Sequence, residues 1–250
     1  MGRLIAFVYG VICYAIFLIA FLYAIGFVGN VVVPKSIDSG TAVGLSQSLL
    51  VNVVLLGLFA VQHSVMARPQ FKRWWTKIVP TPVERSTYVL FASLLLLLLF
   101  WQWRPMQGVI WDVDWTAGNV ALTGLFYLGW GIVLLSTFMI NHFDLFGLRQ
   151  VYLYLRKQEC GETPFKTTGL YKCVRHPIML GFIIAFWATP QMTVGHLVFA
   201  IGTTAYTLIG ILLEERDLVR ILGEDYLDYR RRVGMIIPCL GKRTPPVDNE

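Results

Sequence analysis

Six long apolar segments run through the 250-residue chain and decide what it can fold into. Most are close to the ~20 residues that an α-helix needs to cross the hydrocarbon core of a bilayer. The first is far longer than the ~7 to 15 apolar residues of a signal peptide and has no small-residue cleavage site after it, so we expect it to remain as a helix. The chain is therefore predicted to be an all-α, polytopic membrane bundle of about six transmembrane segments. They cover residues 4–33, 46–65, 88–103, 120–140, 178–188 and 194–213.

The fifth segment, residues 178–188, is too short to cross a bilayer by itself. Thr189 and Pro190 separate it from the sixth, which predicts a tight helical hairpin. Its first arm either gains length by starting at Pro177 or does not cross completely, and the sequence leaves both possibilities open. No internal repeat or change in composition marks a second domain, so residues 1–250 are predicted to form one membrane domain. Residues 239–250 are expected to be a flexible tail.

Positive charge is distributed unevenly over the loops. If all six segments cross, nineteen of the 21 Lys and Arg residues lie on one side, and only Lys35 and Arg104 lie on the other. Because cytoplasmic loops are enriched in Lys and Arg, both termini are predicted to be cytoplasmic. This bias and contact with anionic lipid account for the net charge of +6. We therefore expect the bilayer as a partner and no nucleic-acid role, while the oligomeric state is left undetermined.

The cysteines and histidines do not form a disulfide or metal pattern. The four cysteines contain no CxxC pair, and three of them lie on the predicted reducing, cytoplasmic side. His63 and His142 lack the spacing of haem or metal ligands, so no metal site is predicted. His196, just after the hairpin turn, is expected to face solvent on the outer side. The tryptophans near the span ends are typical of aromatic belts: Trp74, Trp75, Trp101, Trp103, Trp111 and Trp115.

Polar and charged residues concentrate at three places on the predicted cytoplasmic side. Because charge is expensive in lipid, such clusters indicate a functional site, although Arg and Lys also serve as interface anchors. One cluster, NHFDLFGLRQVYL, follows the fourth span. Another, GLYKCVRHPIMLG, opens the fifth segment, and the last, LLEERDLVRILGEDYLDYRRRVGMIIP, follows the sixth.

An antiparallel hairpin would bring the last two clusters to the same membrane face. Arg175 and His176 precede the fifth helix, while Glu214 and Glu215 end the sixth. Pro177 is favoured in a first helical turn because its missing N–H is not needed there. The partial positive charge of the helix N-terminus suits a carboxylate or phosphate. These residues predict a polar, ligand-sized site at the open end of the hairpin.

A simpler interpretation of the same residues is structural. Arg175 and Glu215 could form an interfacial ion pair, with Tyr226 and Tyr229 as membrane anchors. Gly181, one turn into the fifth helix, permits close approach by either a neighbouring helix or a ligand. The compact grouping of the polar residues favours the binding site over this alternative.

Several motifs resemble a known superfamily of membrane enzymes. RHPIMLG, followed by EERDLVRILGEDYLDYRRRV and Pro238, is similar to the C-terminal signature of the isoprenylcysteine carboxyl methyltransferase and phospholipid methyltransferase superfamily. VQHSVMARPQFKRWW, VERSTYVL, NHFDLFGLRQVYLYL and AFWATPQMTVGHL resemble the bacterial methanethiol S-methyltransferases and their NnrU-like relatives. The resemblance covers about residues 50–238 and implies a protein of the bacterial inner membrane.

The resemblance implies S-adenosylmethionine as the methyl donor, bound at the cytoplasmic end of the last hairpin, with the donor-site half at residues 141–238. Its acceptors would be the small thiols methanethiol and hydrogen sulfide, giving dimethyl sulfide and methanethiol. Basic, acidic and aromatic side chains suit the carboxylate, ammonium, ribose and adenine of this donor. Met179 stands where many superfamily members have Tyr, so that ring contact is not carried over. The predicted donor-binding residues are Tyr171, Arg175, His176, Pro177, Gly181, Glu214, Glu215, Tyr226 and Tyr229.

The acceptor thiol must be supplied as a thiolate, because that form is the nucleophile. His142, with Asn141 and Asp144 beside it at a helix end, is the predicted catalytic group that accepts or orients the proton. A hydrogen-bonded structural histidine is the alternative. Gln62 and His63, at the cytoplasmic end of the second span, are the predicted substrate-positioning residues, with an interfacial role as the alternative.

Two further functions remain open at this level. One keeps the donor and changes the acceptor to a prenylated cysteine carboxylate or a lipid amine, which would require a wide opening into the bilayer. The other is a non-enzymatic, NnrU-like accessory membrane protein of nitrogen-oxide metabolism. The donor-site residues favour an enzyme, and the shared motifs favour a small thiol as its substrate.

Overall fold

Five long apolar helices form the frame of the molecule in the computed structural model, which describes residues 2–41, 43–159, 161 and 167–238. Each is long enough to cross a bilayer. The predicted all-α polytopic bundle is therefore confirmed, while the predicted tail at 239–250 lies outside the described residues. The five helices are α1 (Arg3–Gly29), α2 (Leu45–Ala67), α4 (Thr81–Gln102), α5 (Thr116–Ile140) and α9 (Val194–Leu222).

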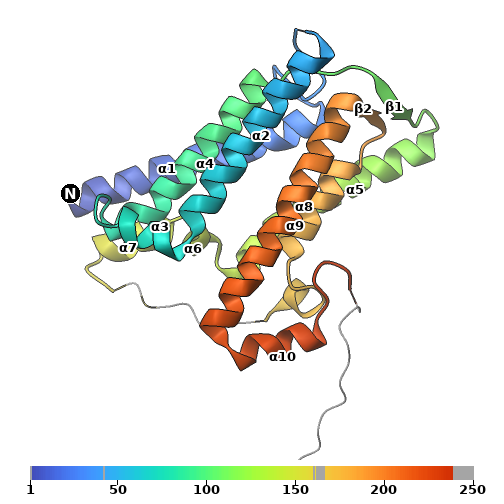
Figure 1. Ribbon diagram of the computed structural model, residues 1–250. Coiled ribbons are helices and arrows are strands. Elements are labelled where there is room, and N and C mark those ends of the chain that lie inside the picture. The colour runs from blue at the N-terminus through green and yellow to red at the C-terminus, as the bar shows by residue number, and fades with distance from the viewer. Residues whose placement is uncertain (1, 42, 160, 162–166, 239–250) are drawn as a thin grey trace, which may run out of the picture.

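Shorter elements lie at the two ends of these helices. Most gather at the end that holds the start of α1, which we call the basic end, and the small two-stranded sheet lies at the opposite end (Figure 1). They are α3 (Pro69–Trp75), β1 (Val109–Asp112), α6 (His142–Leu145), α7 (Leu148–Leu155), the 3₁₀ turn η1 (Gly169–Lys172), β2 (Gln191–Thr193) and α10 (Glu224–Arg232). A further short helix, α8 (Pro177–Trp187), runs alongside α5 and α9.

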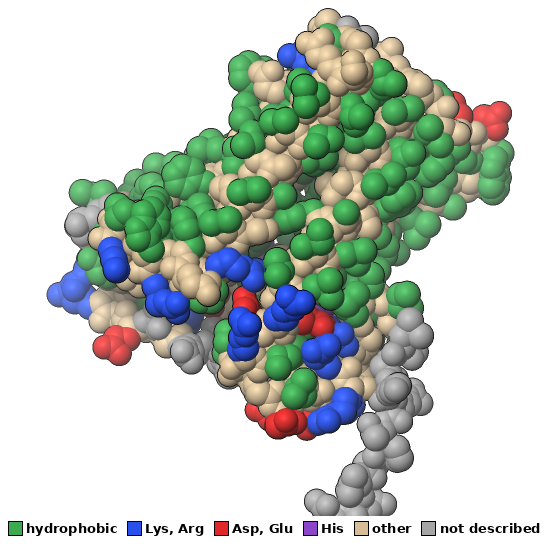
Figure 2. Space-filling view, in the orientation of Figure 1, with side chains coloured by type: hydrophobic (Ala, Val, Ile, Leu, Met, Phe, Trp, Pro, Cys, Tyr) green, Lys and Arg blue, Asp and Glu red, His purple; other side chains and the backbone are tan. Residues whose placement is uncertain are grey.

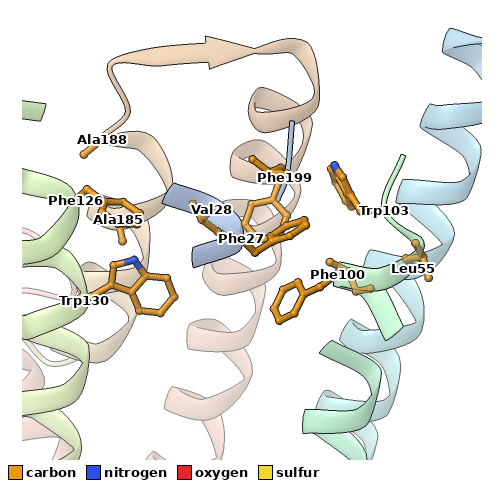
Figure 3. Close-up of a cluster of buried hydrophobic side chains, with 12 residues drawn as sticks. Phe27, Val28, Leu55, Phe100, Trp103, Phe126, Trp130, Ala185, Ala188 and Phe199 are labelled. Atoms are coloured by element: carbon orange, nitrogen blue, oxygen red, sulfur yellow. The ribbon is translucent and has the colours of Figure 1, made fainter. Parts of the chain in front are cut away.

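The helices form two groups that lie side by side. α1 packs on α4 and α7, and α2 packs on α4, whereas α5 packs on α8, which in turn contacts α9 (Figure 1). Buried aromatic side chains join the two groups (Figure 3). Phe21 of α1 meets Trp130 of α5 edge-on at 5.4 Å between ring centroids. Edge-to-face contacts of this kind add to the free energy gained from burying the rings.

The fifth apolar segment forms the short helix α8 and continues into extended chain. α8 has only 11 residues, or about 16 Å of helix. The stretch 188–193 adds up to about 20 Å, because β2 within it is extended and pairs with β1. The second arm, α9, covers roughly 30 Å between Val194 and Glu214. α8 begins at Pro177, as one of the two possibilities from the sequence required, and its crossing of the bilayer stays a prediction.

Two expectations for the end away from the basic residues are wrong. Trp103 is fully buried, packing edge-on against Phe27 and Phe199, so it belongs to the core and not to an aromatic belt. His196 is also fully buried, with Nε2 2.9 Å from the main-chain oxygen of Phe186. It lies in the first turn of α9, on the side that faces α8, and the helix pair covers it.

Candidate functional site

Lys and Arg side chains gather at one end of the molecule, around α10 and the end of α9 (Figure 2). The opposite end shows few of them, in agreement with the loop charges in the sequence. Three buried side chains lie within this basic end. Arg175 Nε donates to Glu215 Oε1 at 2.7 Å, and His176 Nε2 lies 3.2 Å from the same oxygen. All three are at most 9% exposed, so the hairpin does bring these residues together as predicted.

The end of the described chain fixes the position of Arg175. The guanidinium also donates to the main-chain oxygens of Arg230, at 3.2 Å, and Val233. The amides of Arg175 and His176 donate to the oxygens of Gly234 and Met235, at 2.9 and 3.1 Å. The sequence could not predict these hydrogen bonds to main-chain oxygens, because a main-chain oxygen is present in every residue type. The segment after α10 is thereby held against the start of α8.

Glu214 differs from its neighbour in being available to a ligand. Glu215 is enclosed, since Arg230 Nε lies 3.4 Å from its second oxygen. The Glu214 side chain is 48% exposed, and its Oε2 lies 3.6 Å from His176 Nδ1. A carboxylate in this position can accept hydrogen bonds from an ammonium group or from hydroxyls. Glu215 therefore holds the cluster together, whereas Glu214 is left half-exposed beside it.

The three predicted tyrosines lie beside this cluster, but only one of them is accessible. Tyr226 and Tyr229 are buried, with ring centroids 5.8 Å apart, and Tyr171 is half-buried. Tyr229 donates to the main-chain oxygen of Tyr171 at 2.6 Å. Burial raises the pKa of all three phenols, which keeps them neutral. Because membrane anchors are partly exposed, the buried pair are not anchors, and Tyr171 is the ring left to contact a ligand.

Gly181 and Pro177 are buried within the helix packing. A Cβ at Gly181 would lie 2.6 Å from the main-chain oxygen of Gly129. Pro177 occupies the first turn of α8, as predicted. Gly181 therefore allows α8 to pack closely against α5, and it leaves no room for a ligand. Of the two roles that the sequence allowed, close helix packing is the one observed.

His142 occupies a separate aromatic enclosure. Its Nε2 lies 2.8 Å from the hydroxyl of Tyr14 and its Nδ1 2.8 Å from Thr137 Oγ1, while the ring stacks on Phe138. Only 4% of the residue is exposed, and burial lowers its pKa, so the imidazole is neutral. Both ring nitrogens are engaged within this enclosure. Its predicted catalytic role stays a prediction, and the geometry equally suits a structural histidine.

Asn141 and Asp144 line a pocket of about 680 Å³ that also includes Lys72 and Arg85. Asn141 Oδ1 accepts from the amide of Asp144, and Asp144 Oδ1 accepts from Gln150 at 2.9 Å. These bonds shape the turn from α5 into α6 and α7. The pocket does not include the Arg175 cluster, so the structure divides what the sequence had grouped as one site.

His63 and Gln62 lie near the basic end of α2. The Tyr88 hydroxyl lies 3.1 and 3.0 Å from the two ring nitrogens of His63. Gln62 is turned to its own helix, where Nε2 contacts Met66 Sδ at 3.1 Å. Within the described residues, no group of three or more His, Cys, Asp or Glu side chains could hold a metal ion.

Replacement of Tyr229 by Phe gives a pH-dependent test of this arrangement. Burial raises the pKa of Tyr229 from 10.0 to about 12, so the folded state holds the phenolic proton more tightly. Its contribution to stability is complete below pH 10 and is lost as the pH rises from 10 to 12. We expect Tyr229→Phe to lower the free energy of unfolding by about 1 kcal/mol at pH 7. The free energy of unfolding should also fall less between pH 10 and 12 in this variant than in the unmodified protein.

Thermal unfolding of detergent-purified protein at several pH values measures both effects. The control is Tyr127→Phe, because Tyr127 is 51% exposed on α5. An unchanged slope between pH 10 and 12 in Tyr229→Phe would show that the buried phenol is not the titrating group.

Comparison with known proteins gives a consistent set of relatives. The family described as "NnrU protein" matches residues 51–229. A "Methanethiol S-methyltransferase" of Mycobacterium tuberculosis is 61% identical over 98% of this chain and 100% of its own length. Another, of Crocosphaera subtropica, is 56% identical over 98% and 96%. A "Nurim homolog" of Drosophila pseudoobscura pseudoobscura is 30% identical over 64% and 66%. No solved structure matches significantly.

Proposed function

Since this chain belongs to the NnrU family and is 61% identical to a methanethiol S-methyltransferase along nearly its whole length, we propose that it methylates methanethiol to dimethyl sulfide, with S-adenosylmethionine as the donor. The near-full-length similarity to this enzyme supports methanethiol as the acceptor. Hydrogen sulfide is the second acceptor in the proposal, because it is the smaller homologue of the same thiol nucleophile. The geometry of the basic end supports the choice of donor.

The residues at the end of the α8–α9 hairpin fit the polar groups of this donor. Glu214, half-exposed beside His176, suits the ammonium or the ribose hydroxyls. Arg230, 41% exposed and in contact with Glu215, suits the carboxylate. Tyr171 offers a ring face to the adenine. Arg175 already donates to Glu215 and to two main-chain oxygens, so we assign it to positioning the site.

When bound, S-adenosylmethionine supplies an electrophilic methyl group carried by a sulfonium. The work left to this chain is to bind the two substrates next to each other and to exclude water. It must also hold the acceptor as a thiolate, since the thiolate is the nucleophile. Buried, neutral phenols and a compact ion-pair cluster suit a site from which water is excluded. The names of the high-identity relatives favour a small thiol over a prenylated cysteine or a lipid amine, and an enzyme over an accessory protein.

The proposal also places the active site and both termini on the cytoplasmic side of the bacterial inner membrane. The concentration of Lys and Arg at the basic end supports this orientation, because such residues are retained on the cytoplasmic side. Soluble S-adenosylmethionine would then reach the site directly from the cytoplasm.

The test supplies the purified protein with S-adenosylmethionine and either methanethiol or hydrogen sulfide. We expect headspace gas chromatography to detect dimethyl sulfide with the former and methanethiol with the latter. Calorimetry measures donor binding separately. The absence of both product and donor binding would overturn the enzymatic proposal, whereas donor binding without a volatile product would indicate a different acceptor.

A further inference from the structure

Polar side chains line the seam between α2 and α9, within two apolar helices. Ser64 Oγ lies 3.4 Å from the Tyr206 hydroxyl, and the rings of Tyr206 and His63 meet edge-on at 6.4 Å. Nearer the basic end, Arg68 donates to Asp217 at 2.8 Å. Polar and ionisable groups in a membrane-spanning segment are costly, and they often mark a substrate path or a functional site.

The seam opens between these two contacts. They are about 6 Å apart along α2 but about 16 Å apart along α9, so α2 leaves nearly three turns of α9 uncovered. Gly210 lies in this stretch, and a Cβ placed on it would meet no atom within 4 Å. Figure 2 shows a furrow between the two helices at this level. We call it the α2–α9 furrow, bounded by His63, Arg68, Tyr206, Gly210 and Glu214.

The furrow faces the bundle and leads to the proposed donor site. Positions 206, 210 and 214 share one face of α9, since they are spaced four residues apart. The lipid-exposed positions Ile209 and Leu212 lie on another face. Glu214 ends the row, where its carboxylate lies 3.6 Å from His176. A small molecule in the furrow would therefore lie next to the residues assigned to the donor.

His63 is held in an orientation suited to accepting a proton. The Tyr88 hydroxyl can accept from one ring N–H, at 3.0 or 3.1 Å, and donate its own hydrogen to the His63 main-chain oxygen at 3.4 Å. In either tautomer a neutral imidazole keeps one unprotonated ring nitrogen, which can accept a proton. The ring of Phe59 stacks on the imidazole at 5.2 Å, which adds an apolar wall suited to a methyl group.

We propose that the α2–α9 furrow binds the acceptor thiol and that His63 takes up its proton. This inference rests on the proposed function. The S–H bond breaks as the proton passes to the unprotonated ring nitrogen of His63, and the sulfur lone pair forms a new S–C bond to the donor's methyl group. The donor's own C–S bond breaks with its electron pair retained on sulfur, so the sulfonium becomes a neutral thioether. His63 then returns the proton to water.

Filling the furrow tests the binding part of the proposal. Gly210→Leu is expected to raise the KM for methanethiol by about tenfold or more, with the Kd for S-adenosylmethionine, measured by calorimetry, unchanged. Gly131→Leu on α5 is the matched control, because its Cβ position is also open but lies outside the furrow. An unchanged KM in Gly210→Leu would overturn the assignment of the acceptor site.

The proton-accepting role is tested by His63→Gln. We expect kcat at pH 7 to fall about 100-fold, with donor binding retained, and the loss to shrink as the pH rises, because the free thiol then ionises by itself. A variant that only perturbs packing would show no such recovery at high pH. The same pattern in His142→Gln, with His63→Gln active, would return the role to His142. If the unmodified protein forms no product, the proposed function fails, and with it this inference.

Discussion

Glu215→Gln is expected to weaken donor binding by about 100-fold or more, with a large loss of stability. Glu215 is the shared partner of Arg175 and His176, all at most 9% exposed. Removing one member of a buried ion pair costs about 3–5 kcal/mol, because the remaining charge is left uncompensated. Arg175 would lose its orientation, and with it the contacts that hold residues 233–235 on α8. Calorimetry with S-adenosylmethionine and thermal unfolding measure the two effects.

The matched control is Glu224→Gln on α10, where the side chain is 80% exposed and forms an ion pair with Arg231. It removes the same charge from the same end of the molecule, and an exposed pair contributes about 0–1 kcal/mol. Equal loss of donor binding in both variants would show that net charge, and not the buried cluster, determines affinity.

Gly129→Ala is expected to destabilise the protein by about 1–3 kcal/mol through overpacking. Its Cβ would lie 2.7 Å from the amide nitrogen of Ala185 and from the main-chain oxygen of Gly181, and neither backbone atom can rotate away. The reciprocal contact at Gly181 is equally short. Separation of α5 from α8 would also shift Arg175 and His176, so donor affinity should fall together with the unfolding temperature.

Gly131→Ala, two residues further along α5, is the control for this prediction. No atom lies within 4 Å of its added Cβ, and alanine favours a helix over glycine by about 1 kcal/mol. It should therefore leave stability unchanged or raise it slightly. A comparable loss in both variants would mean that the close contact between α5 and α8 is not what limits stability.

The grouping of residues at the proposed donor site could be predicted because it depends on short-range features of the sequence. The break at Thr189 and Pro190 predicts a hairpin, and a hairpin of matched arms has to bring residues 175 and 176 to residues 214 and 215. The sequence could not predict that Glu215 is buried while Glu214 is exposed. Glu215 is enclosed and Glu214 open because the fold of α10 and the chain after it cover only one face of α9.

The surroundings of the histidines could not be predicted from the sequence in the same way. His142 and His63 both stand at helix ends next to aromatic residues, and the sequence favoured His142 as the proton acceptor. The structure surrounds His142 with Tyr14 and Thr137 and sets His63 on the α2–α9 furrow. Tyr14 is 128 positions away from His142 along the chain, so no local pattern could have revealed their contact.

Three features could be predicted from the sequence alone: the long apolar helices, the unequal charge of the two ends and the pairing of the last two helices. Each of these follows from the cost of placing side chains in lipid, which adds up along the chain. The tertiary structure was needed to show which acidic side chain is exposed, which residues surround each histidine, and that Trp103 and His196 are buried. These outcomes depend on how helices far apart in sequence pack against one another, and that is set by the fit of side chains across each contact.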